Sequence, residues 1–339
     1  METAMKAMVV RAPGGLDRIE CAERPDPGPP GPGAIRVALH ASSLNFHDLG
    51  VATGGMRAAD GRVLMADGAG VVEAVGEGVT EFAPGDNVVS CFFPDWQDGA
   101  PTIPDFSRTP GDGIDGFAQE FVTLPATAFT HAPRGFTHLE AATLTTAGLT
   151  AWRALVEDGG LKPGDTVLAL GTGGVSIFAL QLAKLAGARV IITSSSGEKL
   201  ERARDLGADE TINYRETPEW GARVRELTGG RGVDHVVEVG GPGTLPQSIG
   251  AVRVGGHIHL IGVLTGRGGE VPTALLMAKQ ARLQGLIVGS RRQQRDFVRA
   301  LDGGGLRPVI DRVFALEELS EAFRHQEGAG HFGKIGVEW

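Results

Sequence analysis

A glycine-rich hexapeptide, GTGGVS at 171–176, is the first stretch whose residue types and spacing could do chemistry. It follows the apolar run TVLAL and opens a helical pattern, which is the setting of a dinucleotide-binding turn. Gly171 would permit the tight turn, Gly173 would let a pyrophosphate approach the backbone, and the helix start would supply free N–H groups. Ser176 replaces the usual third glycine and could bind phosphate through its hydroxyl. The alternative is an ordinary strand-to-helix turn. The predicted cofactor contacts here are Gly171, Thr172, Gly173, Gly174, Val175 and Ser176.

The second apolar run ends in three serines, Ser194, Ser195 and Ser196, where an NAD-binding turn would carry an acid for the ribose hydroxyls. Hydroxyls with Lys199 nearby would instead bind a 2′-phosphate, which a carboxylate would repel. The sequence therefore predicts NADPH over NADH. Glu198 is the competing residue, since it could serve the ribose, and Lys199 could simply be a surface lysine.

The segments around these residues fall into two kinds. Up to about residue 127, β-branched and alternating apolar runs are separated by Pro/Gly-rich turns, which favours a small β-barrel or sandwich of antiparallel strands. Residues 128–292 alternate apolar runs with helical stretches, which predicts a parallel sheet. In VSIFALQLAKLAGA apolar residues recur at helical spacing and Gly187 provides a helix end. Residues 293–339 predict a helix, a strand, a helix and a last strand that return to the first domain.

Composition excludes several classes of function. At 339 residues the chain predicts two domains, and a net charge of −9 without a basic cluster argues against nucleic-acid binding. No apolar run approaches a bilayer span, and the start is too short for a signal-peptide core, so we expect no membrane contact and a cytoplasmic protein. Cys21 and Cys91 are too far apart in sequence for a CxxC site and predict two separate thiols.

Eight stretches, in this order, resemble the medium-chain dehydrogenase/reductase superfamily over essentially the whole chain: LNFHDLGVATG, ADGAGVVEAVGEGVTEFAPGD, DGFAQEFVTLP, AATLTTAGLTAWRAL, GTGGVS, LGADETINY, VEVGGPGT and the terminal FGK. The resemblance implies an α/β chain with a GroES-like catalytic domain built from both chain ends and a Rossmann domain between them. It also implies a nicotinamide cofactor and commonly a homodimer. The zinc-free quinone oxidoreductase-like and alcohol dehydrogenase-like branches are the most similar.

Within this resemblance, the positions of the catalytic zinc ligands hold Asn45, Ala66 and Thr146, none of which is an effective zinc ligand. The loop that carries four closely spaced cysteines in the family has none here beyond the preceding Cys91. We therefore predict no metal. A regrouping of His47, Asp48, Asp67 and His131 around an ion has no recognisable spacing.

Without zinc, reduction of an activated acceptor, a quinone or an α,β-unsaturated carbonyl, is easier to explain than alcohol oxidation. Asn45 and Thr146 are predicted hydrogen-bond donors to the developing oxyanion, or else residues that brace loops. His47, whose usual pKa lies near neutrality, and Asp48 are predicted acids or relays, although water could protonate the product instead and Asp48 could only brace its loop. In related reductases a lysine and a tyrosine at the spacing of Lys199 and Tyr214 contact the NADPH 2′-phosphate. The resemblance therefore implies that Tyr214 binds the cofactor.

Two further groups complete the predicted site. An aromatic loop should line the acceptor pocket together with Phe46, although packing of the loop onto the barrel is an equal alternative. The loop residues are Phe92, Phe93, Trp96 and Phe106. Turns at strand ends should border the ribose and nicotinamide, with Gly240, Gly262, Val263, Gly289 and Arg291 as contacts. The predicted function is a zinc-independent NADPH-dependent reductase. The alternatives are a metal-free alcohol dehydrogenase/carbonyl reductase and a non-catalytic NADPH-binding protein.

Overall fold

A computed structural model describes residues 4–56, 58–103 and 105–339 as two structural units. The first unit comprises Met1–Leu149 and Val288–Trp339, and the second comprises Thr150–Ile287. The first therefore reaches beyond the predicted boundary at 127 and takes in 288–292, which the sequence had assigned to the Rossmann domain. None of the helices among the described residues has the length and apolar character needed to cross a bilayer.

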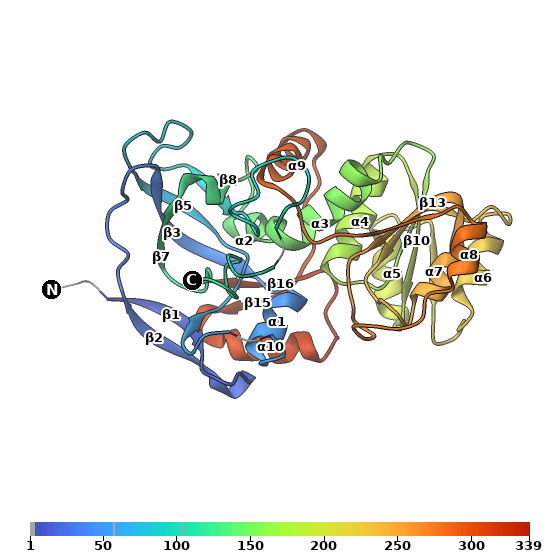
Figure 1. Cartoon of the computed structure of the whole chain (residues 1–339), viewed down its shortest axis with the longest axis horizontal. Coiled ribbons are helices and arrows are strands. Elements are labelled where there is room, and N and C mark those ends of the chain that lie inside the picture. The colour runs from blue at the N-terminus through green and yellow to red at the C-terminus, as the bar shows by residue number, and fades with distance from the viewer. Residues whose placement is uncertain (1–3, 57, 104) are drawn as a thin grey trace. The chain divides into compact units, whose positions relative to one another are not determined.

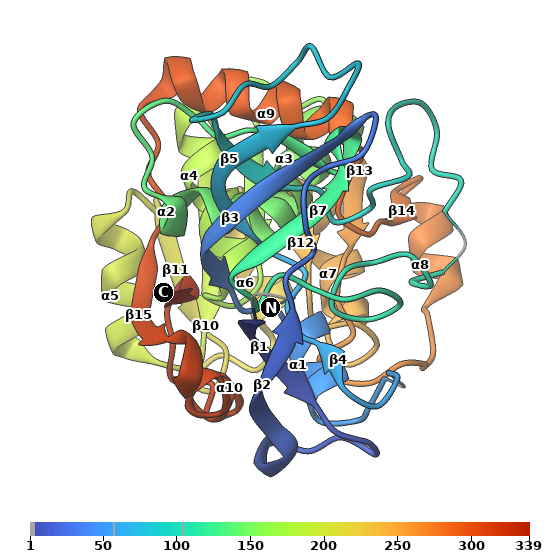
Figure 2. The same ribbon diagram turned by 90° about the vertical axis from the view of Figure 1, so that its left-hand side faces the viewer.

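The first unit is β-rich, as predicted (Figure 2). One sheet has the order β15-β16-β3-β5-β6-β8, with β7 also paired to β3, and a smaller sheet has the order β2-β1-β4. The strands are β1 (Ala4–Val10), β2 (Ile19–Pro25), β3 (Ala34–Ser43), β4 (Arg62–Val63), β5 (Ala69–Val75), β6 (Asn87–Ser90), β7 (Phe121–Pro125), β8 (Phe129–His131), β15 (Ile310–Ala315) and β16 (Lys334–Glu338).

β3 shows why these segments form a sheet. Its inward positions Ile35, Val37 and Leu39 are buried and alternate with half-exposed neighbours, which is the period of a strand with one face on a core. Most pairings are antiparallel, as predicted, but β15 and β16 run parallel because α10 connects them. β16 pairs with β3 through Gly336 and Ser43, so the C-terminal segment does return to the first unit.

Helical segments of the first unit are short apart from α9. They are α1 (Phe46–Ala52), α2 (His138–Ala142), α9 (Arg291–Gly304) and α10 (Leu319–Glu327), with single 3-10 turns at Leu16–Arg18, Ala126–Ala128 and Leu316–Glu318. A π-helical stretch at Leu144–Gly148 leads into α3 (Leu149–Trp152) and a second π-helical stretch at Arg153–Asp158. π-Helical turns are often found at functional sites, and the first of these carries Thr146.

The second unit is built on a six-stranded sheet in the order β11-β10-β9-β12-β13-β14, with every pairing parallel. Its strands are β9 (Thr166–Ala169), β10 (Arg189–Ser194), β11 (Glu210–Asn213), β12 (Val233–Glu238), β13 (Val252–Leu260) and β14 (Arg282–Gly285). Its helices are α4 (Gly174–Leu185), α5 (Gly197–Asp205), α6 (Trp220–Leu227), α7 (Leu245–Ala251) and α8 (Thr273–Ala278). This is the doubly wound arrangement that the alternating pattern predicted.

Helices cover both faces of this sheet: in Figure 1, α4 and α5 lie on one side of the strands and α6, α7 and α8 on the other. Trp220 and Ile249 belong to the core under α6 and α7, together with Val236 of β12 and Ile258 of β13. α4 ends as predicted, with Gly187 in the left-handed region at φ +76°.

Candidate functional site

A buried polar network lies in the first unit around Asp67, whose side chain is fully buried. Asp67 accepts hydrogen bonds from the hydroxyls of Ser43 and Thr146, each at 2.6 Å. Burial raises the pKa of Asp67, while Lys334 opposes that shift. Because Thr146 donates its only hydroxyl proton to Asp67, it has none left for an oxyanion while Asp67 is ionised. That contact favours the bracing role for Thr146.

Lys334, which sequence reasoning did not assign, is the cation of this network and is only 3 % exposed. Its ammonium donates to Asn45 Oδ1 at 2.6 Å and to the carbonyl of Leu44, and lies 3.7 Å from Asp67 Oδ2. Burial lowers the pKa of Lys334 and the facing carboxylates oppose that shift. Lys334 is the lysine of the terminal FGK motif, which was the one sequence signal for it. No short-range pattern in the sequence predicts its contact with Asn45, 289 residues away.

Asn45 and Asp48 hold the start of α1 together. The amide nitrogen of Asn45 donates to Asp48 Oδ2 at 3.0 Å and to the carbonyl of Ser43 at 3.2 Å, and its backbone N–H reaches the same Asp48 oxygen at 2.9 Å. Asp48 also accepts the backbone N–H of Ala66 at 2.9 Å. Both amide hydrogens of Asn45 are therefore used within the network, which favours the bracing alternative over oxyanion donation.

His47 differs from these residues because it has a carboxylate on either side of its ring. Its Nε2 lies 3.3 Å from Asp112 Oδ2, and its Nδ1 lies 3.9 Å from Asp48 Oδ1, an ion-pair contact too long for a hydrogen bond. Burial alone would lower the pKa of His47, but Asp112 and Asp48 outweigh it and raise the pKa to about 9. The imidazole is therefore protonated at neutral pH and can donate a proton. Sequence reasoning missed Asp112.

The predicted aromatic loop gathers against His47. The ring of Phe92 lies 5.3 Å from the imidazole and that of Phe106 lies 5.1 Å from it, measured between centroids. Phe93 packs at 4.8 Å from Phe92 and 6.3 Å from Trp96. The loop thus brings four of the five predicted pocket residues together in the first unit.

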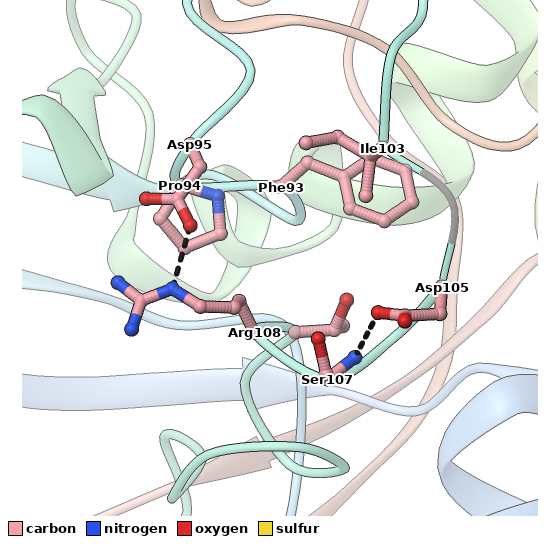
Figure 3. Close-up of a pocket in the computed structure, with 8 residues that line it drawn as sticks. Phe93, Pro94, Asp95, Ile103, Asp105, Ser107 and Arg108 are labelled. Atoms are coloured by element: carbon pink, nitrogen blue, oxygen red, sulfur yellow. Dashed lines mark hydrogen bonds and ion pairs between the residues drawn. The ribbon is translucent and has the colours of Figure 1, made fainter.

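A pocket of about 220 Å³ lies in the same loop (Figure 3). Phe93 and Ile103 form its apolar side, and Arg108 donates to Asp95 at 2.6 Å at the other end of the pocket. Among the predicted aromatics Phe93 lines it, whereas Phe46 is not in its lining and is 56 % exposed. The remaining lining residues are Pro94, Asp105, Ser107 and Thr109.

The family's catalytic zinc does not fit the residues in the first unit. Asn45 offers an amide oxygen that already binds Lys334, Ala66 offers no donor, and the Thr146 hydroxyl is bonded to Asp67. Zinc prefers thiolate, imidazole and carboxylate donors. The alternative grouping around His131 does not form either, since its Nε2 lies 3.1 Å from the carbonyl of Glu81 and its ring packs on Phe82.

The predicted dinucleotide turn stands in the second unit, between β9 and α4. Gly171 is in the left-handed region at φ +73°, and a Cβ added to Gly173 would meet no atom within 4 Å. Gly173 is the N-cap residue of α4, and no side-chain hydrogen bond among the described residues caps this helix start. Gly174 and Val175, which follow, are half-buried, whereas Thr172 is only 6 % exposed. The open space at Gly171 and Gly173, at the start of a helix, suits a pyrophosphate.

Ser176 has a structural role that the sequence prediction did not give it. Its hydroxyl donates to the carbonyl of Leu170 at 2.6 Å and the residue is 2 % exposed. The hydroxyl therefore ties the first turn of α4 to the end of β9, and is not directed at a phosphate. This is a correction, and its cause is that a small side chain at this position faces the strand, as the usual glycine does.

The three serines come together with the other predicted 2′-phosphate contacts. Ser194 ends β10, and its carbonyl accepts the backbone N–H of Tyr214 at 3.1 Å. Ser196 caps α5 by accepting the N–H of Lys199 at 3.3 Å. Ser195 is half-buried and Tyr214 is 42 % exposed, so these side chains border solvent at one strand end.

The turn after β12 is organised by Glu238, a fully buried carboxylate that sequence reasoning missed. Glu238 Oε1 accepts the backbone N–H groups of Gly240 and Gly241 at 2.8 and 3.0 Å, and Ser248 donates to Oε2. The next strand end carries Gly262, where a Cβ would lie 2.2 Å from a backbone oxygen, and Val263, which is 43 % exposed. Both turns lie at strand carboxyl ends, as predicted.

Arg291 corrects another prediction. Its guanidinium donates to the carbonyl of Phe129 and to Glu81, both at 2.7 Å, and the residue is 7 % exposed. It therefore fastens the start of α9 within the first unit and is not free to bind a cofactor. A Cβ on nearby Gly289 would meet Gln293 at 2.8 Å, so this glycine serves close packing.

Comparisons with known proteins agree with this architecture. A family described as alcohol dehydrogenase GroES-like domain matches residues 31–134, and one described as zinc-binding dehydrogenase matches residues 174–303. A zinc-type alcohol dehydrogenase-like protein of Schizosaccharomyces pombe is 41% identical over 95% of each chain. The crystal structure of a Sinorhizobium meliloti 1021 protein named as a candidate alcohol dehydrogenase is 45% identical over 100% of both chains, with a TM-score of 0.93.

An NAD-dependent alcohol dehydrogenase structure is 38% identical, with a TM-score of 0.89, over 99% of this chain and 100% of the other. More distant structures include a quinone oxidoreductase of Pseudomonas syringae at 29% identity over 99% of this chain and 100% of the other, with a TM-score of 0.82. A crotonyl-CoA carboxylase/reductase in complex with NADP is 26% identical over 99% of this chain and 94% of the other, with a TM-score of 0.88. From its fold, its turn and these likenesses, the chain belongs to the medium-chain dehydrogenase/reductase superfamily and is an oxidoreductase of that family.

Proposed function

We propose that the chain is an NADPH-dependent, zinc-independent reductase of an activated acceptor, a quinone or an α,β-unsaturated carbonyl. The observation that carries this proposal is His47, an imidazole between Asp112 and Asp48 with its pKa raised to about 9. A protonated imidazole supplies the proton that must follow a hydride onto such an acceptor. In this proposal the imidazolium takes the place of the zinc ion, a Lewis acid that Asn45 and Thr146 are not suited to bind.

The second unit supplies the cofactor site in this proposal. NADPH, when bound, supplies the hydride. The backbone at Gly171–Val175 would hold the pyrophosphate, and the hydroxyls after β10 with Lys199 and Tyr214 would hold the 2′-phosphate. The NADP complex of the crotonyl-CoA carboxylase/reductase supports this choice, whereas the NAD-dependent alcohol dehydrogenase favours the other cofactor.

In the first unit, the Asp67–Lys334 network holds Asn45, the N-cap residue of α1, and the first turn of this helix carries His47. The imidazole donates its proton to the reduced acceptor and recovers one from water, with Asp112 holding the ring. The acceptor gains one hydride and one proton, so its double bond or quinone is reduced by two electrons and the cofactor is oxidised by two. Phe93, which lines the pocket of the aromatic loop, would supply an apolar contact for a planar acceptor, while Phe92 and Trp96 are buried behind it.

A second candidate function is reduction of an aldehyde or ketone, which the NAD-dependent alcohol dehydrogenase likeness favours. The test is cofactor consumption with matched panels of quinones, 2-enones, aldehydes and secondary alcohols, using NADPH and NADH in parallel, with product analysis. We expect quinone or C=C reduction with NADPH. Reduction at C=O alone would support the second candidate, and binding without turnover would contradict both.

We also propose a homodimer through the second unit. Large apolar side chains are exposed on and around β14 and α8, which is unusual for a surface that faces water. Those at least 37 % exposed are Val263, Leu264, Val271, Leu275, Met277 and Ile287. β14 is the edge of its sheet, where a second copy could add its own strand. Sedimentation analysis of the wild-type chain against Met277→Asp tests this.

A further inference from the structure

Three histidines that take no part in the site described above gather on one face of the parallel sheet in the second unit. His235 lies on β12, and His257 and His259 lie two residues apart on the neighbouring β13. His235 pairs with His257 in the strand register, and His259 pairs with Val237. We propose that these three imidazoles bind one Zn²⁺ ion, which ties β12 to β13.

The arrangement follows from strand geometry. Residues i and i+2 of a strand point to the same face, so His257 and His259 are neighbours on β13 and His235 stands beside them on β12. Val236 and Ile258, one position along, belong to the core under α6 and α7. The histidines therefore occupy the opposite face of the sheet. All three are buried, with exposed fractions of 5, 6 and 0 %.

The distances suit a tetrahedral ion. Nδ1 of His235 lies 3.4 Å from Nε2 of His259, which is long for a hydrogen bond. Two nitrogens at about 2.0–2.1 Å from a tetrahedral zinc are separated by about 3.3 Å. One ligand nitrogen from each ring lies within 4.8 Å of the others, so small rotations bring the third donor to the same centre. A water molecule would complete the four ligands.

The donors suit a metal ion: all three rings are buried, and a neutral imidazole offers a lone pair on one nitrogen. Nε2 of His257 and Nδ1 of His259 are buried and have no hydrogen-bond partner among the described residues. Buried nitrogens without partners are costly in an apolar core, and an ion at this position would engage the lone pair of His257.

A carboxylate lies where an outer partner of a zinc ligand is expected. Oδ2 of Asp165 is 3.4 Å from Nε2 of His235, which leaves Nδ1 of that ring for the ion. Carboxylates commonly orient ligating imidazoles in this way. The side chain of Asp165 is 23 % exposed, so this corner of the site reaches the surface. Arg282, opposite His257 on β14, and Arg253, which acts on His235, disfavour a cation here, whereas Asp165 and Asp234 favour one at His235.

This site departs from the prediction that the chain binds no metal, which concerned the family's zinc positions. The three ligands are drawn from two strands, and 22 residues separate His235 from His257, so no short spacing announces them. The His-x-His pair in HIHL is the only local signal. We expect the ion to be structural, because the residues are buried within one sheet.

The test is metal binding by the tag-free wild-type chain, measured by elemental analysis and by titration with Co²⁺, whose visible spectrum reports tetrahedral nitrogen ligands. We expect one ion per chain and a thermal midpoint that rises when Zn²⁺ is added. His257→Asn should weaken Zn²⁺ binding at least 100-fold and abolish the thermal shift. Asp165→Asn should weaken binding by about 10- to 100-fold while keeping the cobalt spectrum.

His138→Asn is the matched control, because His138 is stacked on His40 at 4.8 Å in the first unit and is not part of the cluster. It should keep full metal binding. If His257→Asn does not fold, the Co²⁺ spectrum of the wild-type chain still decides, since a spectrum without tetrahedral character overturns the proposal. The proposal is also overturned if His257→Asn binds Zn²⁺ as tightly as the control variant does. It is overturned as well if the wild-type chain binds no Zn²⁺.

Discussion

Asp112 Oδ2 lies 3.3 Å from Nε2 of His47, although 65 residues separate them in the chain. Asp48 follows His47 in the chain, and its Oδ1 lies 3.9 Å from Nδ1, the other nitrogen of the His47 ring. Two carboxylates on one imidazole stabilise its protonated form, and they raise the pKa of His47 to about 9 despite its burial. The proton that the proposed reduction needs is thereby held at neutral pH.

Removing one carboxylate should lower that pKa. In Asp112→Asn the imidazole loses a hydrogen-bonded anion, so we expect the alkaline limb of kcat/KM to move from about pH 9 toward the ordinary histidine value. The sign follows because the two carboxylates raise the pKa: in the wild type the imidazole keeps its proton until pH rises through about 9, and with one carboxylate removed it loses the proton at lower pH. A pH profile of kcat/KM on both proteins measures the shift. An unmoved alkaline limb would show that His47 does not control it.

His47→Gln tests the proton donor itself. Glutamine keeps a polar side chain in the same place but cannot donate a proton as an acid, so turnover should fall roughly 10²- to 10⁴-fold. KM for the cofactor should change little, since the residue is in the first unit. Steady-state kinetics at pH 7 give the two constants. Turnover equal to wild type would assign protonation to water.

Much of this fold was predictable because its signals are local. The turn at Gly171 and the helix end at Gly187 depend on residues within a few positions, and both were confirmed by their left-handed backbone. The site was harder, because Lys334 meets Asn45 across 289 residues and Asp112 meets His47 across 65. No periodicity encodes such contacts.

The errors have the same origin. Arg291 follows a strand and a glycine, which is the local context of a cofactor turn, but its partners Phe129 and Glu81 are distant in sequence. Ser176 has the right spacing for a phosphate contact, yet its hydroxyl has a backbone partner at Leu170. A sequence motif predicts where a residue lies in the fold. Only the tertiary structure shows which partners its side chain binds.

The buried Lys334 should stabilise the fold through its partners. In Lys334→Met, Asp67 and Asn45 lose a buried cation, so the free energy of unfolding should fall by about 3–5 kcal/mol. Urea denaturation measures it. The double variant Lys334→Met/Asp67→Asn removes both charges and should recover part of the loss. If the double variant is less stable than the sum of its single variants predicts, the two charges do not compensate each other.

Ser195→Asp tests the choice of cofactor. Ser195 is half-buried at the strand end that carries the proposed 2′-phosphate contacts. A carboxylate there would repel the phosphate and could bind ribose hydroxyls, so KM for NADPH should rise roughly tenfold or more while KM for NADH falls or holds. Ser195→Ala is the control, since it removes a hydroxyl without adding charge. Equal effects of both variants on the two cofactors would argue against a 2′-phosphate site here.

Arg291 offers the complementary test, because the sequence and the structure give it different roles. Its guanidinium binds Glu81 and the carbonyl of Phe129 at 2.7 Å, so Arg291→Met leaves a buried carbonyl and a partly buried carboxylate without their donor. The free energy of unfolding should fall by about 1–3 kcal/mol. Because both partners belong to the first unit, KM for NADPH should stay within about twofold of wild type, unlike in Ser195→Asp. Urea denaturation and cofactor kinetics on one preparation separate the two roles, and a large rise in KM at unchanged stability would restore Arg291 to the cofactor site.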